Sequence, residues 1–188
     1  MRIRQICCDP DLAFSDYHGG SCKTDMCMDL ISSLIDGGHK ALLFSQFTSM
    51  LEILKHKLDE AKIPYYIITG QTPKEKRLEL VKQFNTDDTP VFLISLKAGG
   101  TGLNLTGADT VIHYDPWWNT AAEDQATDRA HRIGQTNIVT VYKLVVKGTI
   151  EERIIELQNQ KAKLAEDLLT GDVASSTFTR EDLLNILD

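Results

Sequence analysis

Three polar side chains in the second half of the chain could bind an anion together. Gln125, Arg129 and Arg132 are spaced four and three residues apart, and an α-helix would carry all three on one narrow face. An arginine fork binds phosphate oxygens through paired hydrogen bonds and stays charged at any working pH. The spacing therefore indicates a phosphate-binding face. Solvated arginines paired with Glu123 and Asp128 explain these residues, taken alone, about as well.

A glycine-rich segment, residues 97–104, could bring backbone N–H groups close to a phosphate. Its sequence, Lys-Ala-Gly-Gly-Thr-Gly-Leu-Asn, matches neither GxxxxGK[ST], because its lysine precedes the glycines, nor GxGxxG. Tight turns explain such glycines as well as ligand contact does. The chain contains no Walker lysine motif and no acidic metal-binding box. We therefore expect that it does not hydrolyse a nucleotide efficiently by itself.

Other catalytic and metal-binding patterns are absent from the sequence. Ser45 and Ser95 lie in no GxSxG elbow, and the five histidines form no ligand pair at helical spacing. His113 falls within an expected strand, which favours a core histidine over a catalytic one. The four cysteines, all within the first 27 residues, match no zinc template. We expect free thiols, no metal site, and a cytoplasmic location, or a nuclear one in a eukaryote.

The charge of the chain is uneven. The 188 residues carry a formal net charge of −7, which argues against a free-standing nucleic-acid-binding protein. Residues 151–188 contribute −5 of this and residues 1–150 only −2, so a local basic strip remains possible on the main body. No apolar run approaches the ~20 residues that span a bilayer, and no membrane partner is expected. One interpretation is a non-catalytic acidic α/β module that binds a protein partner through its C-terminal helices.

The elements that must position these residues alternate along the chain. Apolar or β-branched runs predict strands at 41–45, 65–69, 91–95, 110–114 and 138–145. Amphipathic stretches predict helices between them, at 23–36, from 48 or 49, from 72, and from 149 to about 169. This alternation predicts an α/β fold, a mostly parallel sheet with helices on both faces.

The expected buried stripes follow from helical spacing. The first helix should bury Met26, Leu30 and Leu34, and the helix that begins near 72 should bury Leu78, Val81 and Phe84. Ligands of such sheets meet the loops at the carboxyl ends of the strands. The loops after the first three strands, at 45–46, 69–70 and 95–102, should therefore share one edge.

Several of these strings together resemble the carboxyl-terminal RecA-like lobe of Swi/Snf-like ATPases, the DNA-translocating branch of the superfamily-two helicases. Residues 44–47 resemble motif IV, 95–105 resemble motif V, and 125–135 resemble motif VI. The string from Ala108 to Asn119, with its Trp-Trp-Asn, is similar to a family signature, and residues 4–10 resemble the segment before this lobe. Two departures are Lys97, where the family more often has Arg, and Asp9, where it usually has His.

The resemblance implies a three-layer RecA-like lobe of P-loop type at residues 23–148. Residues 1–22 would be a remnant of the inter-lobe segment, and 149–188 a helical extension. It also implies that ATP and Mg²⁺ are held by a first RecA-like lobe that this chain lacks, so the chain would be a piece of a longer DNA-dependent ATPase. That first lobe and double-stranded DNA would be its partners.

The resemblance also assigns roles to residues. Arg129 and Arg132 would be arginine fingers toward that ATP, and Gln125 would orient or couple to the nucleotide. The residues expected to line the nucleotide cleft or brace the fingers are Gly100, Gly102 and Asn104. Those expected to contact the DNA backbone are Ser45, Gln46, Thr69, Lys97, Thr101 and Trp118. Core packing is an equally good interpretation of Trp118, which follows Pro116 closely.

Overall fold

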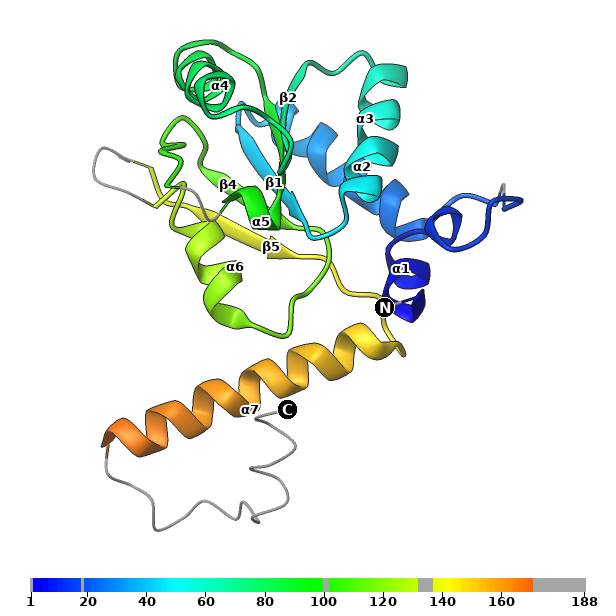
Figure 1. The fold of residues 1–188 in the computed structure, drawn as a ribbon, viewed down its shortest axis with the longest axis vertical. Helices are drawn as coiled ribbons and strands as arrows, with labels where there is room; N and C mark the ends of the chain where they lie inside the picture. The colour runs from blue at the N-terminus through cyan, green and yellow to red at the C-terminus, as the bar shows by residue number, and fades with distance from the viewer. Residues whose placement is uncertain (1, 18, 100–101, 132–136, 171–188) are drawn as a thin grey trace.

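Five parallel strands form one sheet in the order β2-β3-β1-β4-β5. The computed structural model describes residues 2–17, 19–99, 102–131 and 137–170, the last seven through their backbone only. The sheet lies between two groups of helices (Figure 1), which confirms the predicted α/β class. The strands are β1 Ala41–Ser45, β2 Tyr65–Ile68, β3 Val91–Ser95, β4 Thr110–His113 and β5 Thr140–Lys143.

The helices also follow the predicted alternation, except for a short one at 96–99 within a segment predicted as a loop. They are α2 Cys22–Asp36, α3 Thr48–Glu60, α4 Lys74–Thr86, α5 Leu96–Gly99, α6 Thr120–Thr127 and α7 Ile150–Thr170. The sequence pattern did not predict α1, Arg2–Cys8, or the 3-10 turn Pro10–Leu12 that follows it. Asp9 begins this turn, because its carboxylate accepts a hydrogen bond from the N–H of Asp11 at 3.0 Å.

The inner strands are buried on both faces, so their side chains divide between two hydrophobic clusters. Leu43 and Leu93 point into a cluster with α2 and α3. Phe44 and Phe92 point into the cluster on the other face, with α4 and α6. Because every residue of β1 and β3 is buried, the sheet is held in one register on both sides.

Two predicted helical stripes are partly wrong. In α2 the buried face is Cys27, Ile31 and Leu34, while Met26 is 66% exposed. The helix is turned because its first residues, Lys23 among them, are buried by contacts with distant parts of the chain. In α4, Val81 and Phe84 are buried as predicted, but Leu78 is 62% exposed.

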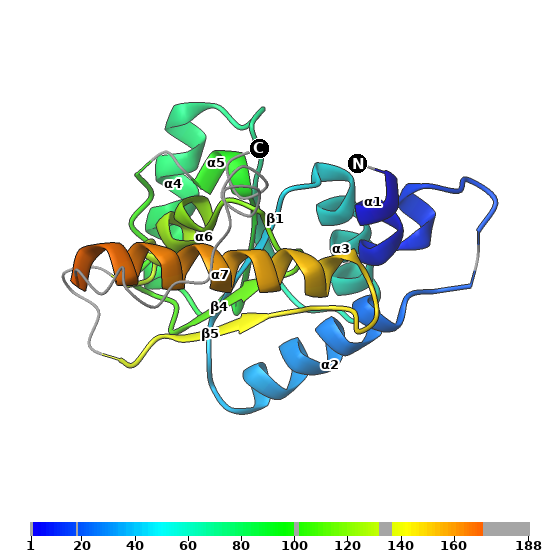
Figure 2. The ribbon, with the colours of Figure 1, turned by 90° about the horizontal axis from the view of Figure 1, so that it is seen from below.

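A buried ion pair joins α2 to the beginning of α7. The Lys23 ammonium lies 2.6 and 2.7 Å from the two carboxylate oxygens of Glu151, and both side chains are almost fully buried. One of these oxygens also accepts the N–H of Val146 at 2.9 Å. From this anchor α7 passes beneath α6 and the β4–β5 side of the sheet (Figure 2). Helix α7 also contacts α1.

No helix within the described ranges combines the length and the apolar character needed to cross a bilayer.

Removing the ammonium from this ion pair should destabilise the lobe strongly. Lys23→Met leaves the Glu151 carboxylate buried and uncompensated, which typically costs about 3–5 kcal/mol. Urea denaturation followed by circular dichroism measures the loss. Lys55→Met is the matched control, because Lys55 pairs with Glu52 on the surface of α3 at 3.4 Å and should cost less than about 1 kcal/mol. Equal losses in the two variants would contradict this assignment.

Candidate functional site

The carboxyl ends of the strands bring the predicted polar residues to one edge of the sheet. Ser45 ends β1 and lies in register with Ser95 at the end of β3. Thr69 follows β2, which pairs with β3 on the other side. Tyr114 and Asp115 follow β4, which pairs with β1. Loops that are distant in sequence therefore meet at this edge, as expected for a parallel sheet.

Asp115 is the centre of hydrogen bonding at this edge. Its buried carboxylate accepts the hydroxyl of Ser45 at 2.5 Å and the backbone N–H of Gln46 at 3.3 Å. Burial raises the pKa of Asp115, and the Ser45 hydrogen bond and the charges of Lys23 and Arg4 act in the opposite direction. Asp115 was not among the site residues predicted from sequence. The signal was an acidic residue directly after a buried strand, within the Asp-Pro-Trp-Trp-Asn string.

The Ser45 side chain is turned into the lobe. Ser45 is only 1% exposed, and its hydroxyl is engaged by Asp115, so it does not present the surface donor that the sequence predicted. Gln46 is half-buried beside it. Among the described residues, the buried Nε2 of Gln46 and Oγ of Ser95 have no hydrogen-bond partner. Both atoms are buried beside the strand ends, where an unpaired polar group is uncommon.

The predicted single helix face for Gln125, Arg129 and Arg132 is wrong in its described part. Helix α6 ends at Thr127, and the N–H of Arg129 bonds back three residues to the carbonyl of Ala126 at 3.2 Å. The chain tightens there into turns. As a result Gln125 is exposed, whereas Arg129 is only 4% exposed. Arg132 lies outside the described residues.

The glycine-rich segment and the arginine segment are joined through their backbones. The N–H of Leu105 donates to the carbonyl of Arg129 at 2.9 Å. The segment begins with the short helix α5, on which Lys97 is exposed, and Gly102 has φ +72°, a conformation that favours glycine. Asn104 is exposed, and its carbonyl accepts the side-chain amide of Asn85 at 2.8 Å. Gly100 and Thr101 lie outside the described residues.

The remaining predicted contact residues lie at the surface or close to it. Thr69 is half-buried, and its hydroxyl accepts the N–H of Gln71 at 3.3 Å. Trp118 is 55% exposed, so core packing does not explain it. Its ring centroid lies 5.8 Å from that of Trp117, and the Lys161 ammonium lies 5.9 Å from the Trp118 ring.

Glu123 holds the loop that precedes α6. This carboxylate, which the sequence suggested as a surface partner for arginine, is 1% exposed. One oxygen accepts the N–H of Trp117 at 2.6 Å, and the other lies 2.6 Å from the Lys143 ammonium. Glu123 thus fixes the loop before α6 to β5, a role that its position in the sequence did not reveal.

His113 is a core histidine, which agrees with the interpretation favoured from sequence. It is 2% exposed, its ring stacks on Phe44 with centroids 5.8 Å apart, and its Nε2 lies 3.1 Å from the hydroxyl of Thr127. Its pKa is lowered from 6.5 to about 4, chiefly by burial; the charge of Glu123 opposes this shift and that of Lys143 adds to it.

Within the described part of the chain, no three histidine, cysteine, aspartate or glutamate side chains gather as they would around a metal ion.

Comparison with known proteins identifies the class of lobe. Residues 22–134 match the model of the helicase conserved C-terminal domain. A crystal structure of the C-terminal part of the Fun30 ATPase domain has a TM-score of 0.71 and 35% sequence identity, covering 81% of this chain and 52% of that one. The fold is therefore a RecA-like helicase lobe.

Proteins of similar sequence define the family of the chain. It is 39% identical over its full length to an uncharacterized ATP-dependent helicase of Mycoplasma genitalium, of which it covers 18%. Over 84% of its length it is 44% identical to the human chromatin-remodeling ATPase INO80, of which it covers 10%. The chain belongs to the helicase C-terminal domain family, and its homologues are Swi/Snf-like ATP-dependent helicases. It spans less than a fifth of the length of these relatives.

The buried neutral His113 should make the lobe less stable in acid. Its folded pKa of about 4 lies below the ordinary 6.5, so between these values the unfolded chain binds a proton that the folded chain excludes. The contribution of neutral His113 to the free energy of unfolding is therefore fully present above pH 6.5 and decreases as the pH falls toward 4. His113→Gln should flatten this part of the stability curve, measured by urea denaturation at several pH values. His56→Gln, at an exposed position on α3, is the control; an unchanged slope in His113→Gln would refute the assignment.

Proposed function

We propose that this chain is the second motor lobe of an ATP-dependent translocase that acts on double-stranded DNA. The observation that carries the proposal is the hydrogen bond between Leu105 and Arg129. It joins the glycine-rich segment to the arginine segment. The relatives named as ATP-dependent helicases and chromatin-remodeling ATPases support the use of ATP.

In this proposal Arg129 and Arg132 act as arginine fingers on ATP that is bound to a partner lobe. Their guanidiniums would offset the charge that develops on the γ-phosphoryl group when the two lobes close. Arg129 is tethered through its backbone to Leu105, so a shift of the glycine-rich segment would move it. Gln125, exposed at the last turn of α6, would contact or orient the nucleotide. Gly100, Gly102 and Asn104 would line the cleft or brace the fingers.

The Mg²⁺ ion that accompanies ATP would be held by the partner lobe. This agrees with the chemistry of the donor set at the strand ends, where Asp115, the buried carboxylate, is already bonded to Ser45 and Gln46. When bound, the ion would neutralise charge on the phosphates. The residues of this chain would contribute position and positive charge.

The DNA grip would lie along the exposed part of the same edge. Lys97 supplies a cation, Thr69 and Thr101 supply hydroxyls, and Trp118 supplies an exposed ring. Gln46, half-buried beside the inward-turned Ser45, would supply a side-chain amide. Contacts of this kind reach the phosphate backbone and carry no sequence information, which suits movement along arbitrary DNA.

The proposal also includes a location and a protein partner for the chain. The protein would work where DNA is found, in the cytoplasm of a bacterium or the nucleus of a eukaryote. The acidic segment 151–188 would offer a second surface, toward a protein partner.

Loss of one finger should abolish turnover and leave DNA binding intact. In the complete protein, Arg132→Ala should reduce DNA-stimulated ATP hydrolysis by about 10³-fold or more. Binding of double-stranded DNA, measured by fluorescence anisotropy, should change little. Arg153→Ala is the control, because Arg153 is exposed on α7 and pairs with Glu156 at 3.4 Å. Normal ATP turnover in Arg132→Ala would contradict the assignment of Arg132 as an arginine finger.

The 188-residue chain alone should show negligible ATPase activity, because it contains no GxxxxGK[ST] motif. A phosphate-release assay with and without double-stranded DNA measures this. Turnover near a few per second would show that the chain carries a complete nucleotide site.

A further inference from the structure

The loop between β4 and α6 is held by side chains from three different helices. Arg4 of α1 donates to the carbonyl of Pro116, Glu123 of α6 accepts the N–H of Trp117, and Gln158 of α7 donates to the carbonyl of Trp117. Three consecutive polar groups of the backbone are therefore bonded to side chains. Such an arrangement fixes a loop that has no regular structure of its own.

Arg4 is fitted to this loop by more than one contact. Its guanidinium lies 2.5 Å from the Pro116 carbonyl oxygen, 5.1 Å from the centre of the Trp117 ring and 6.0 Å from that of Phe47. A planar guanidinium can donate in its plane while its faces contact aromatic rings, and an ammonium cannot reproduce both. Arg4 therefore bridges α1, the loop and the residue that precedes α3.

Gln158 of α7 holds the same loop through a second carbonyl. It is only 4% exposed, its amide nitrogen donates to Trp117, and its amide oxygen lies 3.5 Å from the Lys143 ammonium. Lys143 in turn pairs with Glu123. A closed set of contacts thus links α7, β5, α6 and the loop, and every member would shift if α7 moved.

Both helices lie outside the part of the chain that matches the helicase family model, residues 22–134. They contact each other, and α7 is anchored to the lobe by the buried pair of Lys23 and Glu151. The flanking helices therefore form one support that donates two hydrogen bonds to the loop. We call the side chains of Arg4 and Gln158 the loop clamp.

We propose that the loop clamp positions Trp118 for contact with DNA. Trp118 follows the clamped residues directly and is 55% exposed. The clamp therefore holds the backbone just before Trp118, while the Trp118 ring, 5.8 Å from the Trp117 ring and 5.9 Å from the Lys161 ammonium, stays accessible. An aromatic ring held outward in advance loses little conformational freedom on binding. Arg4 and Gln158 are thus positioning residues. This inference rests on the proposed function for the DNA contact, whereas the clamp itself can be tested without DNA.

Tryptophan fluorescence tests the clamp, because the only two tryptophans of the chain are Trp117 and Trp118. In the 188-residue chain, Arg4→Leu and Gln158→Met each remove one donor to the loop. We expect a shift of the emission to longer wavelength and stronger quenching by acrylamide, with circular dichroism unchanged. Arg4→Lys keeps the charge and should restore the native spectrum only in part.

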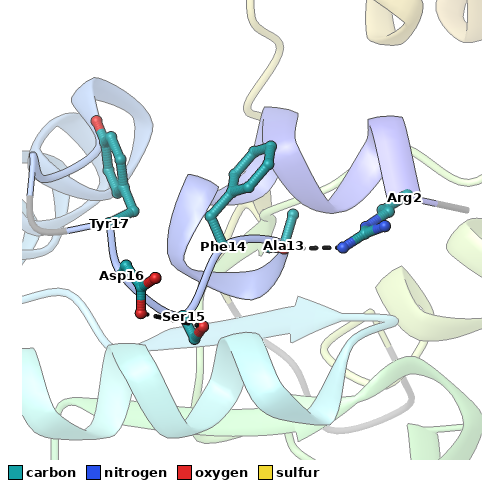
Figure 3. A pocket seen from close by; sticks show the side chains of 6 residues that line it. All are labelled: Arg2, Ala13, Phe14, Ser15, Asp16 and Tyr17. Atoms are coloured by element: carbon teal, nitrogen blue, oxygen red, sulfur yellow. Dashed lines mark hydrogen bonds between the residues drawn. The ribbon is translucent and has the colours of Figure 1, made fainter.

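Two control variants match these substitutions. Arg2→Leu changes the same helix, but Arg2 points to the carbonyl of Ala13 at 3.4 Å, beside a separate surface hollow that Phe14 and Tyr17 also line (Figure 3). Gln160→Met makes the same change on α7 at an exposed position. Both controls should keep the native emission and quenching.

Binding of double-stranded DNA to the same variants tests the role of the clamp. The Kd should rise about tenfold in Arg4→Leu and in Gln158→Met, about 1.4 kcal/mol, and stay unchanged in both controls. If the wild-type chain and the complete protein do not bind DNA, the proposed function fails, while the fluorescence result still decides whether the clamp exists.

Native emission and quenching in folded Arg4→Leu and Gln158→Met would overturn the proposal. Altered fluorescence with unchanged DNA affinity would overturn the positioning of Trp118. If Arg4→Leu does not fold, Gln158→Met decides. If neither folds, the two contacts serve the stability of the whole lobe, and the positioning role is rejected.

Discussion

Burial of the inner strands on both faces is the constraint on which the rest of the structure depends. Side chains of β1 and β3 alternate between two hydrophobic clusters. A slip of either strand by one residue would move every one of its side chains to the opposite cluster and disrupt the packing of both clusters. This fixes the register of Ser45 with Ser95. The polar strand ends are therefore brought to one edge as a consequence of packing elsewhere, and no contact at the edge has to supply that energy.

The edge itself is organised by buried carboxylates whose partners are distant in sequence. Asp115 binds Ser45 and Gln46, Glu123 binds Trp117 and Lys143, and Glu151 binds Lys23. Each acid would be costly to bury alone, and each is compensated by more than one donor. Because Asp115 reaches Ser45 and Glu151 reaches Lys23, the carboxyl-terminal half of the chain is fixed to the amino-terminal half by buried acids as well as by apolar packing.

The strands could be predicted from sequence because their apolar runs are continuous and their lengths typical of buried parallel strands. The edge that carries the candidate site followed from that topology. Predictions about individual helices were wrong where a contact with a distant residue decides which face of the helix is buried. The buried face of α2 depends on Lys23 meeting Glu151, 128 residues away, which no helical spacing can reveal. The end of α6 at Thr127 could not be predicted, because residues 128–131 contain no glycine or proline that would indicate the end of a helix.

The separation of Lys23 from Glu151 has a consequence for the order of folding during synthesis. The Lys23 ammonium emerges from the ribosome near the start of α2, and the Glu151 carboxylate that pairs with it is made 128 residues later. At about 5–20 residues per second this is a delay of roughly 6 to 26 seconds. During that interval Lys23 lacks its carboxylate partner, so we expect the amino end of α2 to close onto the lobe only after Glu151 has been translated.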